Sequence, residues 1–109
     1  MYKVLLAPGV KQELRNALAY IKRKLRNPIA AERLADEAKT ALRNLRSMPE
    51  RYPFCDDTVL RLQGYRHAPV TKYQFIFRIT KHPNQVRVVH FFHETQDYLV
   101  TLKMESPAP

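Results

Sequence analysis

The spacing of the apolar residues changes once along this chain, from a helical to a strand period, and this change limits the fold more than any other feature. Between Val10 and Met48 the apolar residues recur every three or four positions, which places them on one side of a helix. Asn27-Pro28 divides this region, because a residue before proline is disfavoured in the α conformation and proline suits the first turn of a helix. Two helices with so short a connection are expected to form an antiparallel hairpin.

Strand signals lie on both sides of the helical region. Residues 2–7 form an apolar run that Pro8-Gly9 stops, and residues 73–80 alternate between one face with Phe75 and Phe77 and another with Arg78. After a loop at 81–85, residues 86–93 are typical of a returning strand. Residues 58–70 carry broken strand signals around Gly64 and Pro69, which an edge strand would tolerate. The order β-α-α-β-β-β predicts an α+β domain, with the helix hairpin packed on one face of a small, mostly antiparallel sheet.

A chain of 109 residues has room for a single core, so a multidomain enzyme is excluded. We expect one domain over residues 1–103 and a disordered tail over residues 104–109. Residues 49–57 have no period and predict an ordered loop, with Tyr52 and Phe54 in contact with the core. Residues 94–103 are expected to hold a short strand or a helical turn.

The charge of the chain is strongly positive and unevenly distributed. The net charge is +9, and residues 1–48 hold eleven basic and four acidic residues, which leaves +7 on the helical part. Such a surface indicates a polyanionic target or an acidic protein partner, although each cation could equally be a solvated helix residue. The candidate docking cations are Arg15, Lys22, Arg26, Arg43, Arg46 and Lys72.

Several function classes are excluded by what the sequence contains. Two glycines are too few for a glycine-rich phosphate loop, and the single Cys55 cannot form an internal disulfide. His90 and His93 are three positions apart on a strand, so they face opposite sides and make poor joint metal ligands. No apolar stretch approaches the roughly 20 residues of a membrane span. We therefore expect no metal, no cofactor and no membrane partner, and a cytoplasmic location.

His93 is the best candidate for acid–base chemistry, because it ends a strand and polar residues follow it. The alternative is a structural histidine bonded to the backbone at the strand end. Arg66 and Arg78, with Lys72, would form a cationic surface if they line the sheet face away from the helices, and Tyr98 could stack on a base there. The candidate catalytic residues are thus His93, Arg66, Arg78 and Tyr98.

The order of elements and a series of short motifs resemble toxins of the RelE/ParE superfamily, from bacterial type II toxin–antitoxin systems. The resemblance covers roughly residues 2–102. Its strongest part is the pair of strands at 73–78 and 86–94, followed by Asp97. The other motifs are, in chain order, Tyr2-Lys3-Val4, Tyr20-Ile21, Asn27-Pro28, Ala30-Ala31, Leu34, Leu45, Pro49, Tyr52-Pro53 and Gly64-Tyr65-Arg66.

The resemblance implies a growth-inhibiting toxin that a cognate, acidic antitoxin neutralises by packing a helix, and often a strand, over the basic surface. RelE-like members cut mRNA on the translating ribosome without a metal, through attack of the 2′-OH on the adjacent phosphate. ParE-like members inhibit DNA gyrase instead. The resemblance thus leaves two targets, and a basic nucleic-acid-binding domain without toxicity is a third reading of the composition.

Two departures from the RelE pattern favour the ParE branch. RelE-type toxins carry an arginine after the aromatic residue that opens the third strand, where this chain has Gln74 after Tyr73. They also carry arginine or lysine beyond the last long strand, where this chain has Glu94-Thr95-Gln96. Neutral side chains cannot supply the fixed positive charge that a phosphorane-like transition state needs. We therefore favour gyrase inhibition, with mRNA cleavage as the alternative if Arg66, Arg78 and Tyr98 rebuild the site.

Overall fold

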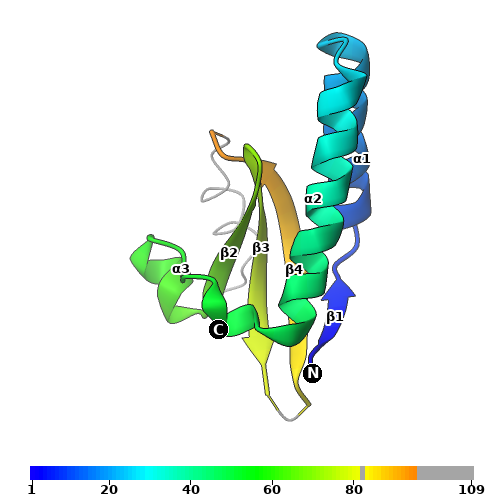
Figure 1. Cartoon of the computed structure of the whole chain (residues 1–109). Helices are drawn as coiled ribbons and strands as arrows, with labels where there is room; N and C mark the ends of the chain where they lie inside the picture. The colour runs from blue at the N-terminus through cyan, green and yellow to red at the C-terminus, as the bar shows by residue number, and fades with distance from the viewer. Residues whose placement is uncertain (82, 96–109) are drawn as a thin grey trace.

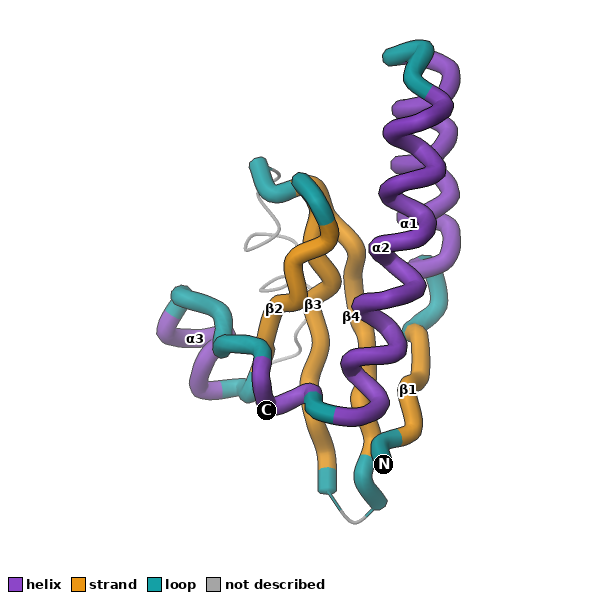
Figure 2. The backbone as a smooth tube through the Cα atoms, viewed as in Figure 1, coloured by secondary structure: helices purple, strands orange, loops and turns teal. Residues whose placement is uncertain are grey.

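The computed structural model describes residues 1–81 and 83–95, and a four-stranded sheet with a helix hairpin on one face dominates this part (Figures 1 and 2). The hairpin extends well past one end of the sheet (Figure 1). The elements, in order, are β1 (Lys3–Leu6), α1 (Val10–Ala19), a π-helical turn η1 (Tyr20–Lys24), α2 (Pro28–Ser47), a 3-10 turn η2 (Pro49–Arg51), α3 (Thr58–Leu62), β2 (Tyr65–Val70), β3 (Tyr73–Thr80) and β4 (Gln85–His93). The predicted α+β architecture is confirmed.

The helix hairpin begins and turns where the sequence predicts. Gly9, at φ 97°, allows the sharp change of direction from β1 into α1. At the turn, the side chain of Asn27 accepts a hydrogen bond from the Ala30 N–H at 3.1 Å, and Pro28 occupies the first position of α2. Arg26, in the left-handed region at φ 50°, completes the reversal. The short Asn27-Pro28 connection therefore ends one helix and caps the next.

The strands are ordered β1-β4-β3-β2 in the sheet. β2, β3 and β4 form an antiparallel meander, and β1 lies parallel to β4, with Lys3 opposite Gln85 and Leu6 opposite Val88. β2 is at an edge, which explains how it accommodates Pro69, a residue with no N–H for a second neighbour.

Both faces of the sheet are partly covered. The larger core lies under the hairpin, where Leu34 and Leu45 of α2 pack with Phe75 and Phe77 of β3. On the opposite face a smaller cluster joins Cys55, Leu60, Tyr65, Ile76 and Phe92. The alternation predicted for residues 73–80 is thus confirmed, and each set of β3 side chains has its own core.

Two local predictions are wrong. Residues 58–62 form the helix α3 instead of a strand, because Asp57 accepts a hydrogen bond from the Leu60 N–H at 3.1 Å and so caps a helical turn that buries Leu60. Phe54 is not buried with the core: it is 41% exposed, and the guanidinium of Arg66 lies 3.9 Å from its ring centroid. Tyr52, by contrast, packs edge-on against Phe77 with 6.0 Å between ring centroids, as predicted.

Tyr98, the tail at 104–109 and most of the element expected at 94–103 lie outside the described residues. The single domain over 1–103 stays a prediction. No helix in the described part is long and apolar enough to cross a membrane.

Candidate functional site

A hollow lies between the hairpin and the end of the sheet where β4 finishes, and we call it the His93 hollow. It has a volume of about 330 Å³. β4 contributes His93, the turn between β2 and β3 contributes Lys72, and α2 contributes Arg33. The full lining is Tyr20, Ile21, Leu25, Asn27, Ala30, Arg33, Leu34, Thr71, Lys72, Tyr73 and His93.

The chemistry of the His93 hollow suits an anionic or aromatic group. Arg33 and Lys72 supply fixed positive charge, and the rings of Tyr20 and Tyr73 supply flat apolar surface. Burial raises the pKa of the Tyr73 hydroxyl, with a smaller contribution from Tyr20, so this phenol stays protonated at neutral pH. The Tyr73 hydroxyl can therefore donate a hydrogen bond to a group in the hollow.

The His93 ring is hydrogen-bonded to Thr95, two residues further along the chain. Its Nδ1 accepts a hydrogen bond from the Thr95 N–H at 3.1 Å and lies 2.8 Å from the Thr95 hydroxyl. Its ring also packs edge-on against Tyr73, with 5.0 Å between centroids. Because Nδ1 accepts the Thr95 N–H, the acceptor nitrogen of the ring is already engaged in a hydrogen bond with the chain itself. These contacts favour the structural alternative for His93.

His90 faces the other way, toward α1. Its Nδ1 lies 3.1 Å from Glu13 Oε2, while Glu13 Oε1 accepts the Phe91 N–H at 3.2 Å. Glu13 thus covers the stretch of β4 that extends beyond β1. Within residues 1–81 and 83–95, no three His, Cys, Asp or Glu side chains come together as a group that could hold a metal ion.

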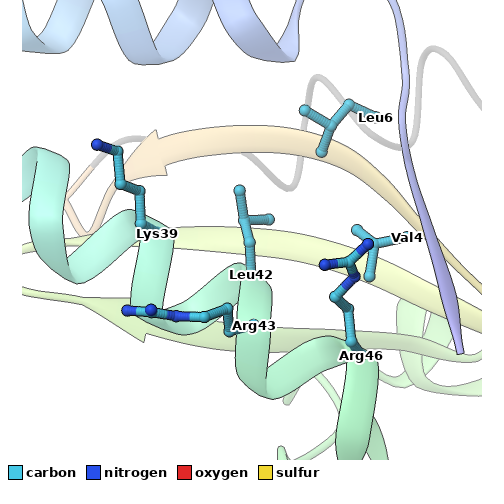
Figure 3. A pocket seen from close by; sticks show the side chains of 6 residues that line it. All are labelled: Val4, Leu6, Lys39, Leu42, Arg43 and Arg46. Carbon is cyan, nitrogen blue, oxygen red and sulfur yellow. The ribbon is translucent and has the colours of Figure 1, made fainter. Parts of the chain in front are cut away.

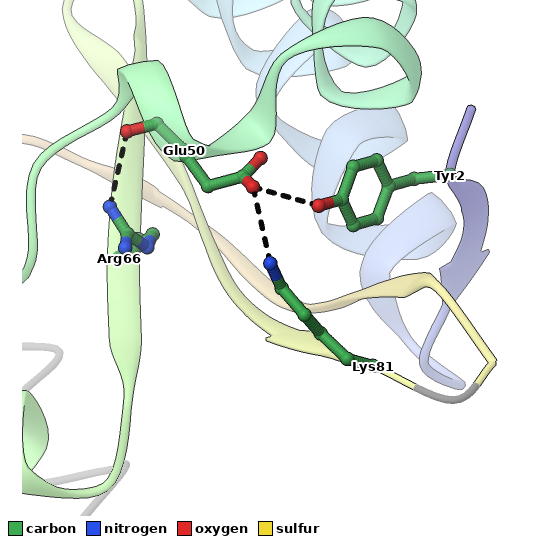
Figure 4. Close-up of polar contacts among 4 residues, drawn as sticks. All are labelled: Tyr2, Glu50, Arg66 and Lys81. Carbon is green, nitrogen blue, oxygen red and sulfur yellow. Dashed lines mark hydrogen bonds and ion pairs between the residues drawn. The ribbon is translucent and has the colours of Figure 1, made fainter.

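Arg66 braces the segment that follows α2 (Figure 4). Its Nη1 donates to the carbonyl oxygens of Tyr52 at 2.6 Å and Glu50 at 3.3 Å, and its guanidinium lies 3.9 Å from the Phe54 ring centroid. These contacts engage Nη1 and one face of the guanidinium. Arg66 therefore acts as a structural brace in this fold.

The carboxylate of Glu50, next to that brace, ties together two further parts of the chain (Figure 4). Its Oε2 accepts the Tyr2 hydroxyl at 2.8 Å and pairs with Lys81 Nζ at 3.6 Å. The hydrogen bond from Tyr2 is the main cause that lowers the pKa of Glu50, and the same bond raises the pKa of Tyr2. The N-terminus, η2 and the β3–β4 hairpin thus meet at one surface carboxylate.

The three candidate catalytic residues that the structure describes do not converge. Arg66 is opposite Phe77, under the hairpin, whereas Arg78 is opposite Tyr65 on the other face, with its guanidinium 4.8 Å from that ring centroid. The cationic surface expected from both arginines on one face is therefore absent from the described chain. His93 is paired with Tyr73, five residues along β3 from Arg78, or roughly 17 Å.

The predicted docking cations lie in three separate places. Arg43 and Arg46 border a second hollow, between α2 and β1, together with Lys39 (Figure 3). Lys72 lines the His93 hollow. Arg15, Lys22 and Arg26 are exposed along α1, η1 and the hairpin turn. No single basic surface gathers all six.

Sequence reasoning missed Arg33, Tyr20 and Lys39 as members of these hollows. Arg33 and Lys39 were visible as cations off the apolar stripe, but nothing in the spacing separates them from solvated helix residues. Tyr20 lies in the π-helical turn, which rotates the following residues relative to α1 and which no residue pattern announces. Whether these three residues line a hollow depends on the angle at which the hairpin crosses the sheet.

Solved structures with the same fold are toxins and toxin–antitoxin complexes. The chromosomal ParDE system from P. aeruginosa aligns with a TM-score of 0.66 at 12% identity, over 85% of this chain and 96% of that one. The RelBE2 complex from Mycobacterium tuberculosis aligns with a TM-score of 0.59 at 17% identity, over 84% and 96%. A YoeB/ParE toxin from Agrobacterium tumefaciens aligns with a TM-score of 0.57 at 10% identity, over 84% and 96%. At these identities the likeness shows the fold alone.

The sequence comparison identifies the family more specifically than the structural comparison does. A search of curated proteins finds no match. The family model described as the ParE toxin of the type II toxin–antitoxin system parDE, however, matches residues 4–98, which include every described strand except the first residue of β1. The chain therefore belongs to the ParE toxin family of type II toxin–antitoxin systems.

Proposed function

We propose that this chain stops bacterial growth by inhibiting DNA gyrase in the cytoplasm, and that a cognate acidic antitoxin neutralises it. One observation supports the choice of target: among the described residues, the arginines and the histidine that the sequence suggested for RNA cleavage are dispersed. Arg66 is committed to backbone carbonyls, Arg78 lies on the far face, and His93 accepts a hydrogen bond through Nδ1. Arg66 and Arg78 are therefore not placed to stabilise in-line attack on a phosphate beside His93.

The family match also favours gyrase as the target. The matching model describes ParE, and the ParDE system of P. aeruginosa is among the similar structures. The net charge of +9 favours an acidic partner, in agreement with an antitoxin that covers the toxin.

RelE-like mRNA cleavage is the second candidate, and the His93 hollow is the observation in its favour. Arg33 and Lys72 could contact a phosphate there, and Tyr20 or Tyr73 could stack on a base. On this reading the active residues would be Arg33, Lys72 and His93 instead of the arginines of the sheet.

The two candidates separate in a single experiment. The chain is expressed from a tightly repressed promoter in bacteria that carry a reporter plasmid, and plasmid supercoiling and messenger integrity are followed after induction. Gyrase inhibition predicts loss of negative supercoiling and a DNA-damage response while messages stay intact. Unchanged supercoiling with cuts inside translated codons would overturn the proposal in favour of the nuclease.

A second measurement uses purified gyrase. The refolded chain should inhibit supercoiling of plasmid DNA, and the effect should disappear when the antitoxin is added first. Salt-sensitive binding to naked nucleic acid together with normal growth on induction would instead identify a basic nucleic-acid-binding domain.

A further inference from the structure

The charged side chains around the His93 hollow are all positive. Arg33 of α2 and Lys72 of the β2–β3 turn border it, and none of the described residues that line it is acidic. Neither cation forms an ion pair with a described carboxylate, and both side chains are exposed. Two positive charges are therefore available to a ligand at this place.

The neutral polar groups of the hollow also present donors, because the chain itself engages their acceptors. The side-chain oxygen of Asn27 accepts the Ala30 N–H at 3.1 Å, which leaves the amide NH₂ group to donate. The Nδ1 atom of His93 accepts the Thr95 N–H at 3.1 Å, so the other ring nitrogen is a donor. The Tyr73 hydroxyl keeps its proton at neutral pH, because burial raises its pKa. A set of donors of this kind suits an anion rich in acceptor oxygens.

Apolar surface lies beside these donors. Tyr20 and Leu25 both line the hollow and are 51% and 55% exposed. Tyr73 is stacked on Phe91, with 5.2 Å between ring centroids, whereas Tyr20 has no ring contact with another described aromatic side chain. A planar group that enters the hollow can therefore stack on Tyr20.

Three irregular stretches of backbone border the same hollow. Tyr20 opens the π-helical turn η1. Arg26, at φ 50°, lies between Leu25 and Asn27, which both line the hollow. Thr71 lines it too and has φ 55°, a value that is rare for a β-branched residue. Because π-helical turns and strained residues concentrate at binding sites, their convergence indicates a site that is built to hold a ligand.

We infer that the His93 hollow binds a nucleoside monophosphate. Its phosphate carries about 1.5 to 2 negative charges at neutral pH, which match the two positive charges of Arg33 and Lys72. Its base stacks on Tyr20. A volume of about 330 Å³ is near the lower end of small-molecule sites, roughly 300 to 1,000 Å³, and suits one nucleotide. The inference does not depend on the cellular target, because Arg66 and Arg78 take no part in this site.

The first test titrates the full chain with three small ligands and follows the heat of binding. Adenosine 5′-monophosphate should bind about 10-fold more tightly than ribose 5-phosphate, which lacks the base, and at least about 30-fold more tightly than adenosine, which lacks the phosphate. Equal binding of the monophosphate and ribose 5-phosphate would overturn the inference, because the base would then make no contact. Absence of saturable binding at millimolar monophosphate would also overturn it.

Substitutions locate the binding. Arg33→Gln with Lys72→Gln should lower the affinity for adenosine 5′-monophosphate roughly 30-fold. The matched control, Arg43→Gln with Arg46→Gln, removes the same charge at the second hollow and should change the affinity by less than about twofold. Tyr20→Ala should lower the affinity for the monophosphate about 10-fold and leave that for ribose 5-phosphate unchanged. An equal loss in the control would show attraction to net charge alone and overturn the inference.

A measurement on the parent chain covers the case in which a substituted chain fails to fold. Adenosine 5′-monophosphate should shift the backbone amide NMR signals of Ala30, Thr71 and Lys72, and leave those of Leu42 and Arg43 in place. Shifts of equal size at both hollows would overturn the inference. Single-stranded RNA that shifts the same signals and binds at least about 10-fold more tightly than the monophosphate would assign the hollow to a nucleic-acid strand and also overturn it. A chain that binds the monophosphate as expected but does not inhibit growth would refute only the proposed function.

Discussion

Replacement of His93 separates a structural role from a catalytic one. His93→Ala removes the acceptor of the Thr95 N–H and the edge contact with Tyr73. The hydrogen bond is solvent-exposed and contributes about 0.5 to 1 kcal/mol, and the ring contact contributes about 0.5 to 1 kcal/mol more. We therefore expect the free energy of unfolding to fall by about 1 to 2 kcal/mol.

The matched variant is His93→Asn. Its side-chain oxygen can accept the Thr95 N–H in place of Nδ1, so it should recover up to about half of the lost stability, although it cannot transfer a proton. If the chain inhibits gyrase, both variants should keep the parent's half-inhibitory concentration to within about threefold. If His93 were the general base of a nuclease, both should lose roughly 100-fold or more in activity.

Stability is measured by urea unfolding followed by circular dichroism or tyrosine fluorescence, since the chain has no tryptophan. Activity is measured as supercoiling by purified gyrase and as growth after induction. A stable His93→Asn protein that no longer inhibits growth would refute the structural role argued for His93, and with it the main reason for choosing gyrase over mRNA.

Three further outcomes follow from the packing and polar contacts. Arg66→Ala should lower the free energy of unfolding by about 2 kcal/mol, because it removes two hydrogen bonds and the contact with Phe54. Arg78→Ala removes one ring contact of an exposed side chain and should lower it by about 0.5 kcal/mol. Equal losses of unfolding free energy, measured by urea unfolding, would contradict the bracing role of Arg66. Leu45→Ala, at a fully buried site under the hairpin, should cost about 3 kcal/mol by the same assay, while Leu62→Ala, at an 82% exposed site, should stay within about 0.5 kcal/mol. The pKa of Glu50 in the folded chain lies below its ordinary value of 4.5, so the stability that this carboxylate contributes is present above pH 4.5 and is lost as the pH falls through the folded pKa. Glu50→Gln should therefore flatten this part of the curve of unfolding free energy against pH. If the variant and the parent have the same slope there, Tyr2 and Lys81 do not hold the carboxylate.

The hairpin and the meander could be predicted from local patterns because each of their signals acts over a few residues. Proline at 28 and the cap at Asn27 act within one helical turn, and the alternation of Phe75 and Phe77 acts within one strand. The segment at 58–62 escaped prediction because a five-residue helix is too short to show a period. Its cap at Asp57 and its burial of Leu60 against Cys55 decide its structure.

The candidate site was harder to predict, because it depends on which distant elements meet. Sequence reasoning selected cations and a histidine of suitable chemistry, and it considered Arg66 and Arg78 on one face of the sheet, the face away from the helices. One residue of register separates the two faces of a sheet, and the observed pairing of Arg66 with Phe77 and of Tyr65 with Arg78 puts the arginines on opposite sides. The sequence shows neither this register nor the set of residues that line the His93 hollow.

The sequence by itself determined the order of the helix hairpin and the strands, the positive net charge and the resemblance to the RelE/ParE toxins, since these follow from local periodicity, composition and motifs. Only the tertiary structure decided that Arg66 is a brace, that His93 is bonded to Thr95 and that Arg33 and Lys72 line a hollow together with His93. The physical reason is that the sequence gives the chemical type of each side chain, whereas the contacts of that side chain depend on strand register and helix packing. Register and packing are set by the burial of the core as a whole.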